Sequence, residues 1–279
     1  MLDNTRPPTS KPFKSIAVRN KLSVTIITKN EEAAIAACLA SVAWADEVVV
    51  VDSGSTDKTV EICKAHGAIV HSTTQWPGFG PQKNIALGFA SHEWVLSIDA
   101  DERISPELRA EIEQALSLNS ANVAYQIPRS SSYCGQFMHH SGWWPDYVLR
   151  MFPKSQATFS DDIVHEHVIF KGEIKTLKNS LLHISYTDLE EVLDKTNRYS
   201  SDGATKLAAR GKTASLSSAI LHGIWAFMRT YVLRFGFLDG RMGFVLAVSN
   251  AETTYYRYLK LMLLTQQKPT ISPENNVPK

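Results

Sequence analysis

Two aspartates one residue apart follow a short apolar run, and this pair is the part of the sequence best suited to chemistry. The run, residues 94–98, is typical of a buried parallel strand, and Asp99, Asp101 and Glu102 follow it. Acids at the carboxyl end of such a strand face the crevice where an open α/β sheet binds ligands. Carboxylate oxygens suit Mg²⁺ or Mn²⁺ and leave coordination positions for substrate phosphates. The pair therefore predicts a divalent metal, held by Asp99 and Asp101, that neutralises a diphosphate.

The simpler interpretation of these acids is a solvated turn that caps the next helix. Ser105, Pro106 and Glu107 already form a helix start, however, with an N-cap, a first-turn proline and an early acid. Asp99 and Asp101 are therefore not needed as caps and remain available for chemistry.

The segments before the pair alternate between strands and helices. We expect strands at residues 22–28 and 47–51, with a shorter one at 68–71 and helices between them. Strand and helix alternating in steps of about 20 residues is the βαβ pattern. It predicts an α/β fold, a mostly parallel sheet with helices on both faces.

Two turns of this pattern carry further candidates. Asn30 can cap the helix after the first strand, with Glu31 and Glu32 against its positive end. The second strand ends in Asp52, whose carboxylate could accept hydrogen bonds from a ribose or a base, and Gly54 permits a tight bend. The alternative for this turn is an ordinary bend with an N-cap.

Lys83 is a candidate for contact with phosphate. It lies in the first turn of an expected helix, after a loop rich in Gly and Pro at residues 73–81. A cation there opposes the helix dipole unless an anion lies nearby, and a diphosphate would supply one. The alternative is an ordinary exposed lysine.

Composition excludes several classes of protein. The 279 residues suffice for one large domain or one domain with an appendage, and 29 basic against 28 acidic side chains give a net charge of +1, which argues against nucleic-acid binding. Three widely spaced cysteines indicate a reducing compartment rather than disulfides or a zinc scaffold. Residues 1–20 lack an apolar signal core and are interpreted as a flexible leader, so we expect a cytoplasmic protein.

Four segments together resemble a known family in order and spacing. They are ITKNEE (27–32), VDSGSTD (51–57), QKN (82–84) and SIDADE (97–102). The combination is similar to the nucleotide-sugar half of family 2 glycosyltransferases with the GT-A fold. A Q-x-x-R-W motif of the processive synthases is not found, which favours transfer of a single sugar. The likeness continues through GWWPDYVLRMF (142–152). Within the family, the chain most resembles lipopolysaccharide core enzymes that add glucose to an inner-core heptose.

The resemblance implies roles for the candidates above. It places Thr28, Asn30 and Glu31 or Glu32 beside the nucleotide, and Asp52 with Gly54 at the uridine. It also places Lys83 and Asp99 at the diphosphate, with Asp99 and Asp101 as ligands of Mg²⁺ or Mn²⁺. The donor is then a UDP-sugar and the acceptor a lipid-linked saccharide.

An inverting transfer also needs a base for the acceptor hydroxyl. The resemblance makes Glu166 the first choice and Asp146 the second, with His165 orienting the base or touching the diphosphate. The rival interpretation of His165, Glu166 and His167 is a zinc site, but the histidines are two apart instead of the four of H-E-x-x-H. Arg150 lies in an expected strand and needs an acid or phosphate partner if buried.

Trp143 and Trp144 have two interpretations. They could stack on the apolar face of the acceptor sugar, or they could form a hydrophobic plug in a loop. The catalytic domain would span residues 21–186, with a nucleotide-sugar half at 21–118 and an acceptor half at 119–186.

Residues 187–265 are expected to be helical, beginning with a capping box at Asp188 and Glu191. Apolar, aromatic and arginine residues mix in this region, but none of its apolar stretches reaches the roughly 18–20 uncharged residues of a membrane-spanning helix. The mixture suits either a helix in the inner-membrane interface or a homo-oligomer contact. Residues 266–279 are interpreted as a disordered tail.

Two other function classes compete with sugar transfer. A haloacid dehalogenase type phosphatase also places D-x-D after a strand, but it asks for Thr or Val where Arg103 stands here. A non-catalytic membrane assembly protein could keep the fold alone. We expect the protein to be a glycosyltransferase rather than either of these.

Overall fold

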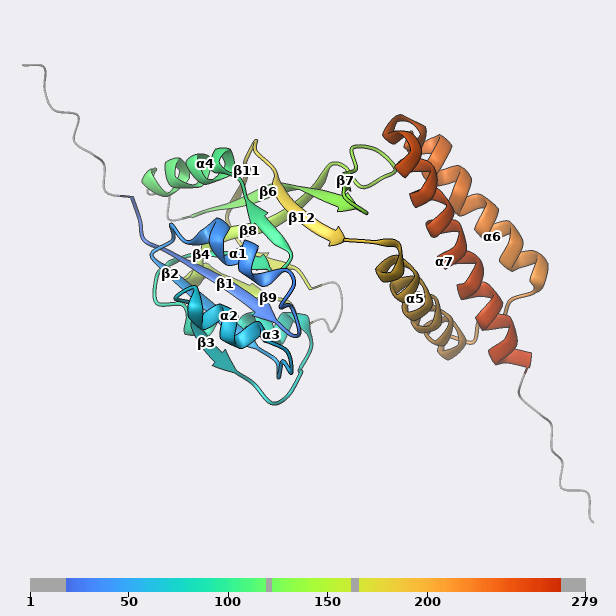
Figure 1. Cartoon of the computed structure of the whole chain (residues 1–279), viewed down its shortest axis with the longest axis horizontal. Helices are drawn as coiled ribbons and strands as arrows, with labels where there is room; N and C mark the ends of the chain where they lie inside the picture. Colours follow the sequence, from blue (N-terminus) through green and yellow to red (C-terminus); the bar gives the residue numbers. More distant parts are fainter. Residues whose placement is uncertain (1–18, 119–121, 162–165, 267–279) are drawn as a thin grey trace, which may run out of the picture.

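The computed structural model describes residues 19–118, 122–161 and 166–266. Within these ranges ten strands form one mixed sheet and two more form a separate ribbon. The sheet and its helices lie at one end of an elongated molecule and the C-terminal helices at the other (Figure 1). Most of the predicted leader, most of the predicted tail and His165 fall outside the described residues.

The first half of the chain forms the parallel part of the sheet. Its strands run in the order β3-β2-β1-β4, and all neighbours are parallel. Their bounds are β1 Leu22–Thr28, β2 Glu47–Asp52, β3 Ile69–Ser72 and β4 Trp94–Asp99. The βαβ prediction is confirmed.

Helices cover both faces of this half. Because strand side chains alternate between faces, Val24 and Ile26 join the core under α1 and α4, whereas Ile27 joins a second core under α3. All seven residues of β1 are therefore buried. The helices are α1 Ile35–Val42, α2 Thr59–Ala65, α3 Phe79–Phe89 and α4 Pro106–Ser117.

The second half makes the sheet mixed, because β8 lies antiparallel between β4 and β6. Beyond β6 the order continues with β12 and β5, and β7 and β11 also pair with β6. The strands are β5 Glu102–Ile104, β6 Val123–Tyr133, β7 Gln136–Phe137, β8 Asp146–Pro153, β11 Glu173–Thr176 and β12 Leu181–Tyr186. A turn of 3-10 helix, η1 Lys154–Gln156, leads to the ribbon of β9 Ala157–Phe159 and β10 Val168–Phe170.

The C-terminal region is helical, as predicted. Asp188 caps its first helix and accepts a hydrogen bond from the Glu191 backbone N–H at 2.9 Å. The elements are α5 Leu189–Ala209, α6 Leu216–Met228, η2 Arg229–Leu233, η3 Gly236–Asp239 and α7 Gly240–Gln266, and α7 packs against both α5 and α6 (Figure 1). Across the described residues, every helix is too short or too polar to cross a membrane.

Two local predictions about helix starts were wrong. Asn30 does not cap α1, which begins at Ile35. It adopts a left-handed φ of 56°, and its side-chain oxygen accepts a hydrogen bond from the Thr56 N–H at 2.8 Å. The helix of Lys83 begins earlier than predicted, at Phe79, so Lys83 lies in its second turn and is buried. The interpretation of Lys83 as an exposed lysine is therefore wrong.

Candidate active site

Asp99, the last residue of β4, lies between two cations. Its Oδ1 is 3.0 Å from Lys83 Nζ, and its Oδ2 accepts a hydrogen bond from Arg150 Nη2 at 2.6 Å. Burial alone would raise the pKa of Asp99, but Arg150 and Lys83 outweigh it and hold this pKa well below its usual range. Asp99 is thus ionised with both oxygens engaged. Arg150 also donates to buried Glu102 at 2.6 Å, so its predicted need for an acid partner is confirmed.

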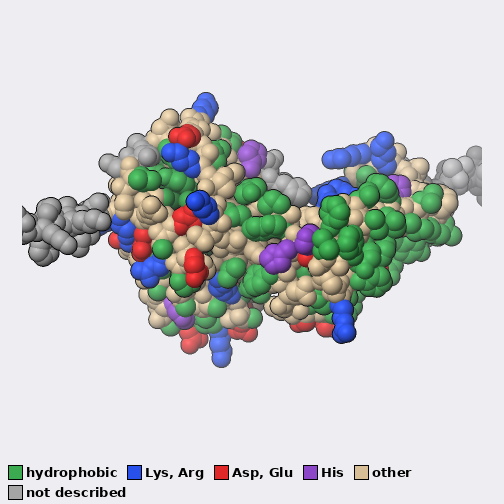
Figure 2. All heavy atoms as spheres, turned by 90° about the horizontal axis from the view of Figure 1, so that it is seen from above, with side chains coloured by type: hydrophobic (Ala, Val, Ile, Leu, Met, Phe, Trp, Pro, Cys, Tyr) green, Lys and Arg blue, Asp and Glu red, His purple; other side chains and the backbone are tan. Residues whose placement is uncertain are grey.

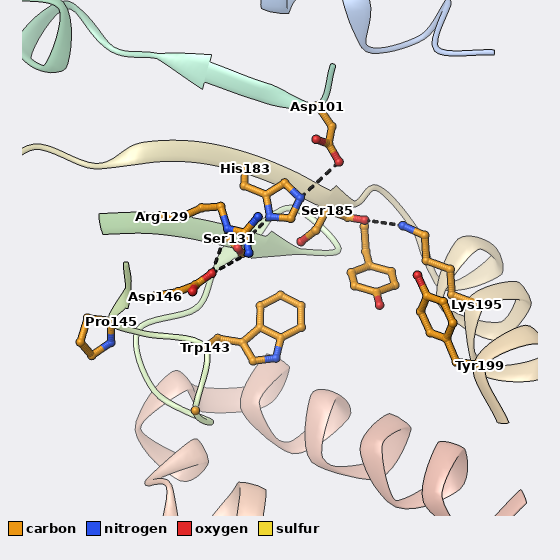
Figure 3. Close-up of a pocket in the computed structure, with 12 residues that line it drawn as sticks. Asp101, Arg129, Ser131, Trp143, Pro145, Asp146, His183, Ser185, Lys195 and Tyr199 are labelled. Carbon is orange, nitrogen blue, oxygen red and sulfur yellow. Dashed lines mark hydrogen bonds and ion pairs between the residues drawn. The ribbon is translucent and has the colours of Figure 1, made fainter. Parts of the chain in front are cut away.

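Asp101 lies beside a histidine, whereas Asp99 lies between cations. It lies between β4 and β5, and its Oδ2 is 3.2 Å from Nε2 of His183 on β12. Nδ1 of the same ring lies 2.9 Å from the Ser131 hydroxyl on β6 (Figure 3). Strand pairing fixes this geometry, because His183 is in register with Ser131 on one side and Glu102 on the other. A carboxylate and an oriented imidazole therefore converge at the sheet edge.

Two cavities meet at Asp101 and His183. The one beside the end of β1, which we call the β1 cavity, has a volume of about 560 Å³. The other, the β6 cavity, has a volume of about 490 Å³ and lies between β6, the loop before β8 and the start of α5 (Figure 3). Both volumes are typical of small-molecule sites. The β1 cavity is lined by Thr28, Glu31, Trp76, Phe79, Asp99 and Arg198, and the β6 cavity by Arg129, Trp143, Asp146, Ser185, Lys195 and Tyr199, among others.

The predicted metal ligands fit a metal only in part. Among the described residues, groups of three or more His, Cys, Asp or Glu side chains suited to a metal do not occur. Both Asp99 oxygens are engaged by cations, whereas Asp101 and His183 offer one carboxylate and one imidazole at an open edge. Mg²⁺ is commonly held by one or two carboxylates together with substrate phosphates, and a neutral imidazole is a common metal ligand in proteins. Asp101 and His183 therefore fit a cation that a bound diphosphate would help to hold.

Thr28 and Glu31 line the β1 cavity. Thr28 Oγ1 is buried and without a hydrogen-bond partner within the described residues. Glu32 instead accepts a hydrogen bond from the Lys58 N–H at 3.0 Å, at the start of α2.

Asp52 is buried and closes its own turn. Its Oδ2 accepts hydrogen bonds from the backbone N–H groups of Gly54 and Ser55, both at 3.0 Å, and its Oδ1 accepts one from the Ser55 hydroxyl. Gly54 has a φ of +83°, which explains the glycine at this position. The structure thus places Asp52 in a rigid turn at the end of β2.

The candidate bases Glu166 and Asp146 lie in different surroundings. Glu166 accepts a hydrogen bond from Lys83 Nζ at 2.8 Å, which joins it to the Asp99 ion pairs. Asp146 lines the β6 cavity, where Arg129 donates to its Oδ2 from Nε at 2.9 Å and from Nη2 at 2.7 Å. His165 lies outside the described residues.

The two tryptophans also separate. Trp143 lines the β6 cavity and contacts Tyr133 and Tyr186, with ring centroids 5.8 and 6.0 Å apart (Figure 3). Trp144 instead packs its ring edge-on against His139, at 6.4 Å. The structure therefore places Trp143 in the lining of the β6 cavity and Trp144 against His139.

Comparison with known proteins decides the family. The model of the family described as "Glycosyl transferase family 2" matches residues 23–177, which include the strand-end acids, Lys83, Asp146 and Glu166. The chain belongs to this family. A glycosyltransferase is therefore favoured over the phosphatase and the assembly protein, and the mixed sheet is a GT-A type fold.

Relatives of this glycosyltransferase extend over nearly its whole length. A protein of Rickettsia typhi named an uncharacterized glycosyltransferase is 35% identical over 92% of this chain and 91% of its own. The lipopolysaccharide core biosynthesis glycosyltransferase LpsC of Rhizobium meliloti is 29% identical over 85% of this chain and 93% of its own. Both relatives are named as glycosyltransferases, in agreement with the family match.

Among solved structures, glucosyl-3-phosphoglycerate synthase of Mycobacterium tuberculosis, in complex with Mn²⁺ and UDP, is 29% identical over 42% of this chain and 45% of its own, with a TM-score of 0.34. The N-terminal part of Staphylococcus aureus TarS is 18% identical over 88% of this chain and 92% of its own, with a TM-score of 0.43.

Sequence reasoning missed several residues of the glycosyltransferase site. His183 stands alone in β12, and Arg129 and Ser131 lie in β6 without a recognisable motif. They become site residues only through strand pairing, since Arg129 is in register with Asp146 and Ser131 with His183. Lys195 and Arg198 reach the cavities from α5, beyond the family match.

Glu31 should make the stability of the enzyme depend on pH. Burial and the nearby charge of Asp101 raise its pKa to about 7. Because this pKa exceeds the unfolded value, the native state binds the extra proton, and this stabilisation is lost as pH rises from 4.5 through 7. After allowance for solvent screening, we expect the unfolding free energy to fall by roughly 2 kcal/mol over this pH range because of Glu31. Glu31→Gln should not show this fall, because glutamine does not titrate. Urea unfolding of the metal-free protein at pH 5 and pH 8 measures this, and equal pH dependence in both proteins would contradict it.

Asp239, in η3, anchors the loop that carries Trp143 and Asp146. Its Oδ1 accepts from the His139 N–H at 3.0 Å and its Oδ2 from the His140 N–H and the Ser141 hydroxyl, each also at 3.0 Å. Local sequence patterns do not predict this contact, because about 100 residues separate its partners. Asp239 is therefore a positioning residue for the β6 cavity.

Asp239→Asn should loosen this anchor, because an amide cannot accept all of these hydrogen bonds. We expect a loss of about 2–4 kcal/mol in unfolding free energy and about a tenfold rise in the acceptor KM, with the donor KM changed less than about twofold. Steady-state kinetics with each substrate varied measures this, with exposed Glu190→Gln on α5 as the matched control. Equal rises in both KM values would point to general damage instead.

Proposed function

We propose that this glycosyltransferase moves one sugar, glucose, from a UDP-sugar to a heptose of the lipopolysaccharide inner core, with inversion. The observation that carries the proposal is that two cavities of ligand size share Asp101 and His183. A donor in the β1 cavity and an acceptor in the β6 cavity would therefore meet at this pair. The relation to LpsC supports a lipopolysaccharide acceptor.

In the β1 cavity, Thr28 and Glu31 would contact the nucleotide. Asp101 and His183 would hold the Mg²⁺ or Mn²⁺, with Asp99 keeping Lys83 and Arg150 in place beside it. When bound, the metal would stabilise negative charge on the leaving diphosphate. Arg198 lines the same cavity and brings a permanent positive charge to it.

In the β6 cavity, Trp143 would hold the acceptor sugar and Asp146 would act as the base. The acceptor hydroxyl attacks the anomeric carbon, its proton passes to Asp146, and the bond from that carbon to the diphosphate breaks with its electron pair. Both acids are paired with a cation, Asp146 with Arg129 and Glu166 with Lys83. We prefer Asp146 because it lines the β6 cavity, where the acceptor would bind.

Replacing each acid tests this assignment. Asp146→Asn should lower kcat about 10²–10⁴-fold, because proton transfer loses its acceptor. Glu166→Gln should act mainly on Lys83, raising the donor KM with kcat changed less than about tenfold. Transfer from UDP-glucose to a heptose-terminated core saccharide measures both. A larger loss of kcat in Glu166→Gln than in Asp146→Asn would instead identify Glu166 as the base.

The two halves of the catalytic domain would each bind one substrate. Residues 21–118 would bind the donor and residues 119–186 the acceptor, with 187–265 as a helical region. The protein would work in the cytoplasm, on the inner face of the inner membrane, where a lipid-linked acceptor presents its saccharide.

A further inference from the structure

The outer side of the C-terminal helices carries an unusually apolar surface. Hydrophobic side chains gather over these helices in the space-filling view (Figure 2). Six of them, in α6, η2, η3 and the residue before η3, are each at least 56% exposed, and we call them the apolar face. They are Leu221 (65%), Ile224 (56%), Trp225 (58%), Leu233 (57%), Phe235 (56%) and Leu238 (58%). Apolar surfaces of this kind mark contact with a partner or a membrane.

The apolar face points away from the rest of the protein. On the opposite side of α6, Gly223 is buried so closely against α7 that an added Cβ would lie 3.1 Å from Tyr255 Cβ. Leu221, Ile224 and Trp225 have the spacing of one helical stripe, so α6 packs with its small residues and exposes its large ones. The exposure therefore follows from how the helices pair.

The exposed acidic and basic side chains between residues 216 and 251 are all arginines. Arg229, Arg234 and Arg241 are exposed there, and between residues 216 and 251 the only acid is Asp239. Its side chain is 3% exposed and is used by the loop before β8. Arginine mixed with Trp, Phe and Leu is the composition of segments that lie in a membrane interface, and the positive charge matches anionic headgroups.

We propose that the apolar face, with Arg229, Arg234 and Arg241, docks on an anionic lipid surface. A second copy of the chain is a poorer occupant. In a two-fold dimer the same patch would meet itself and bring arginines of both copies into one apolar interface. A lipid surface accepts the apolar side chains and neutralises the arginines together.

The docking surface adjoins the β6 cavity. The Arg234 carbonyl oxygen accepts a hydrogen bond from the Ser141 N–H at 2.8 Å, and the Arg234 side chain lies against Gly142, which lines the β6 cavity. Docking would therefore bring that cavity to the lipid surface. The use of that cavity for the acceptor rests on the proposed function, whereas docking itself does not.

Flotation with lipid vesicles tests the inference without donor or acceptor. The full chain should float with vesicles of equal parts phosphatidylcholine and phosphatidylglycerol, and bind phosphatidylcholine alone at least about tenfold more weakly. Arg229→Gln with Arg241→Gln should weaken binding about thirtyfold. Trp225→Ser with Leu233→Ser should abolish it. Circular dichroism melting confirms that each variant is folded.

Matched controls lie on the catalytic part. Ile169→Ser with Ile174→Ser removes comparably exposed apolar residues, and Lys171→Gln with Lys178→Gln removes two exposed charges. Neither should change flotation. The inference is overturned if the unchanged protein stays unbound, or if controls and test variants lose binding equally. A dimer in sedimentation that Trp225→Ser with Leu233→Ser disrupts, without vesicle binding, would assign the face to a second copy.

Discussion

Asp101→Asn should reduce sugar transfer by about a thousandfold or more while leaving the protein folded. Asp101 presents its carboxylate to both cavities beside His183, so the change removes charge where the leaving diphosphate would be stabilised. The Asp101 side chain is one third exposed, at 33%, so its loss should have little effect on stability. Transfer rates and thermal unfolding together measure the two effects.

A ligand-binding measurement separates this role from general damage. UDP with Mn²⁺ should raise the melting temperature of the unchanged protein, because a ligand that binds only the native state stabilises it. That rise should vanish in Asp101→Asn and in His183→Ala, and it should persist in Asp202→Asn, an exposed acid of α5. Full transfer activity in Asp101→Asn would remove the basis for the metal assignment.

The largest effect on stability is expected at Arg150. It is 6% exposed, and its Nη2 donates to both Asp99 and Glu102 at 2.6 Å. Arg150→Met would leave Glu102, which is fully buried, with its nearest cation removed. Breaking a buried ion pair from one side costs about 3–5 kcal/mol, and we expect a loss of that size in urea unfolding.

The double variant Arg150→Met with Glu102→Gln is the control. It removes the buried charge together with its partner, so it should recover a large part of the lost stability. The loss in Arg150→Met alone should also shrink at low pH. Burial raises the pKa of Glu102, and without Arg150 the destabilising charge is relieved as Glu102 protonates. Two results would argue against this role of Arg150. One is that the effects of the two substitutions on the unfolding free energy simply add, and the other is that the loss in Arg150→Met does not depend on pH.

Local patterns predicted much of the fold. The run at 22–28 became β1 with the same bounds, Ser105 caps α4 by accepting from the Leu108 N–H at 3.2 Å, and Asp188 caps α5. Prediction failed where a side chain bonds to a distant turn. Asn30 has the composition of a cap, but it bonds to Thr56 across the strand ends instead.

The sequence by itself determined the parallel half-sheet and the acids at the end of β4. These depend on residues close together in the chain, where periodicity and capping act directly. Only the tertiary structure decided how the acids are used. It paired Asp99 with Arg150 and Lys83, and it left Asp101 facing His183, which is 82 residues away. The physical reason is that the register between β5, β12 and β6 sets these distances, and register depends on the packing of the whole sheet.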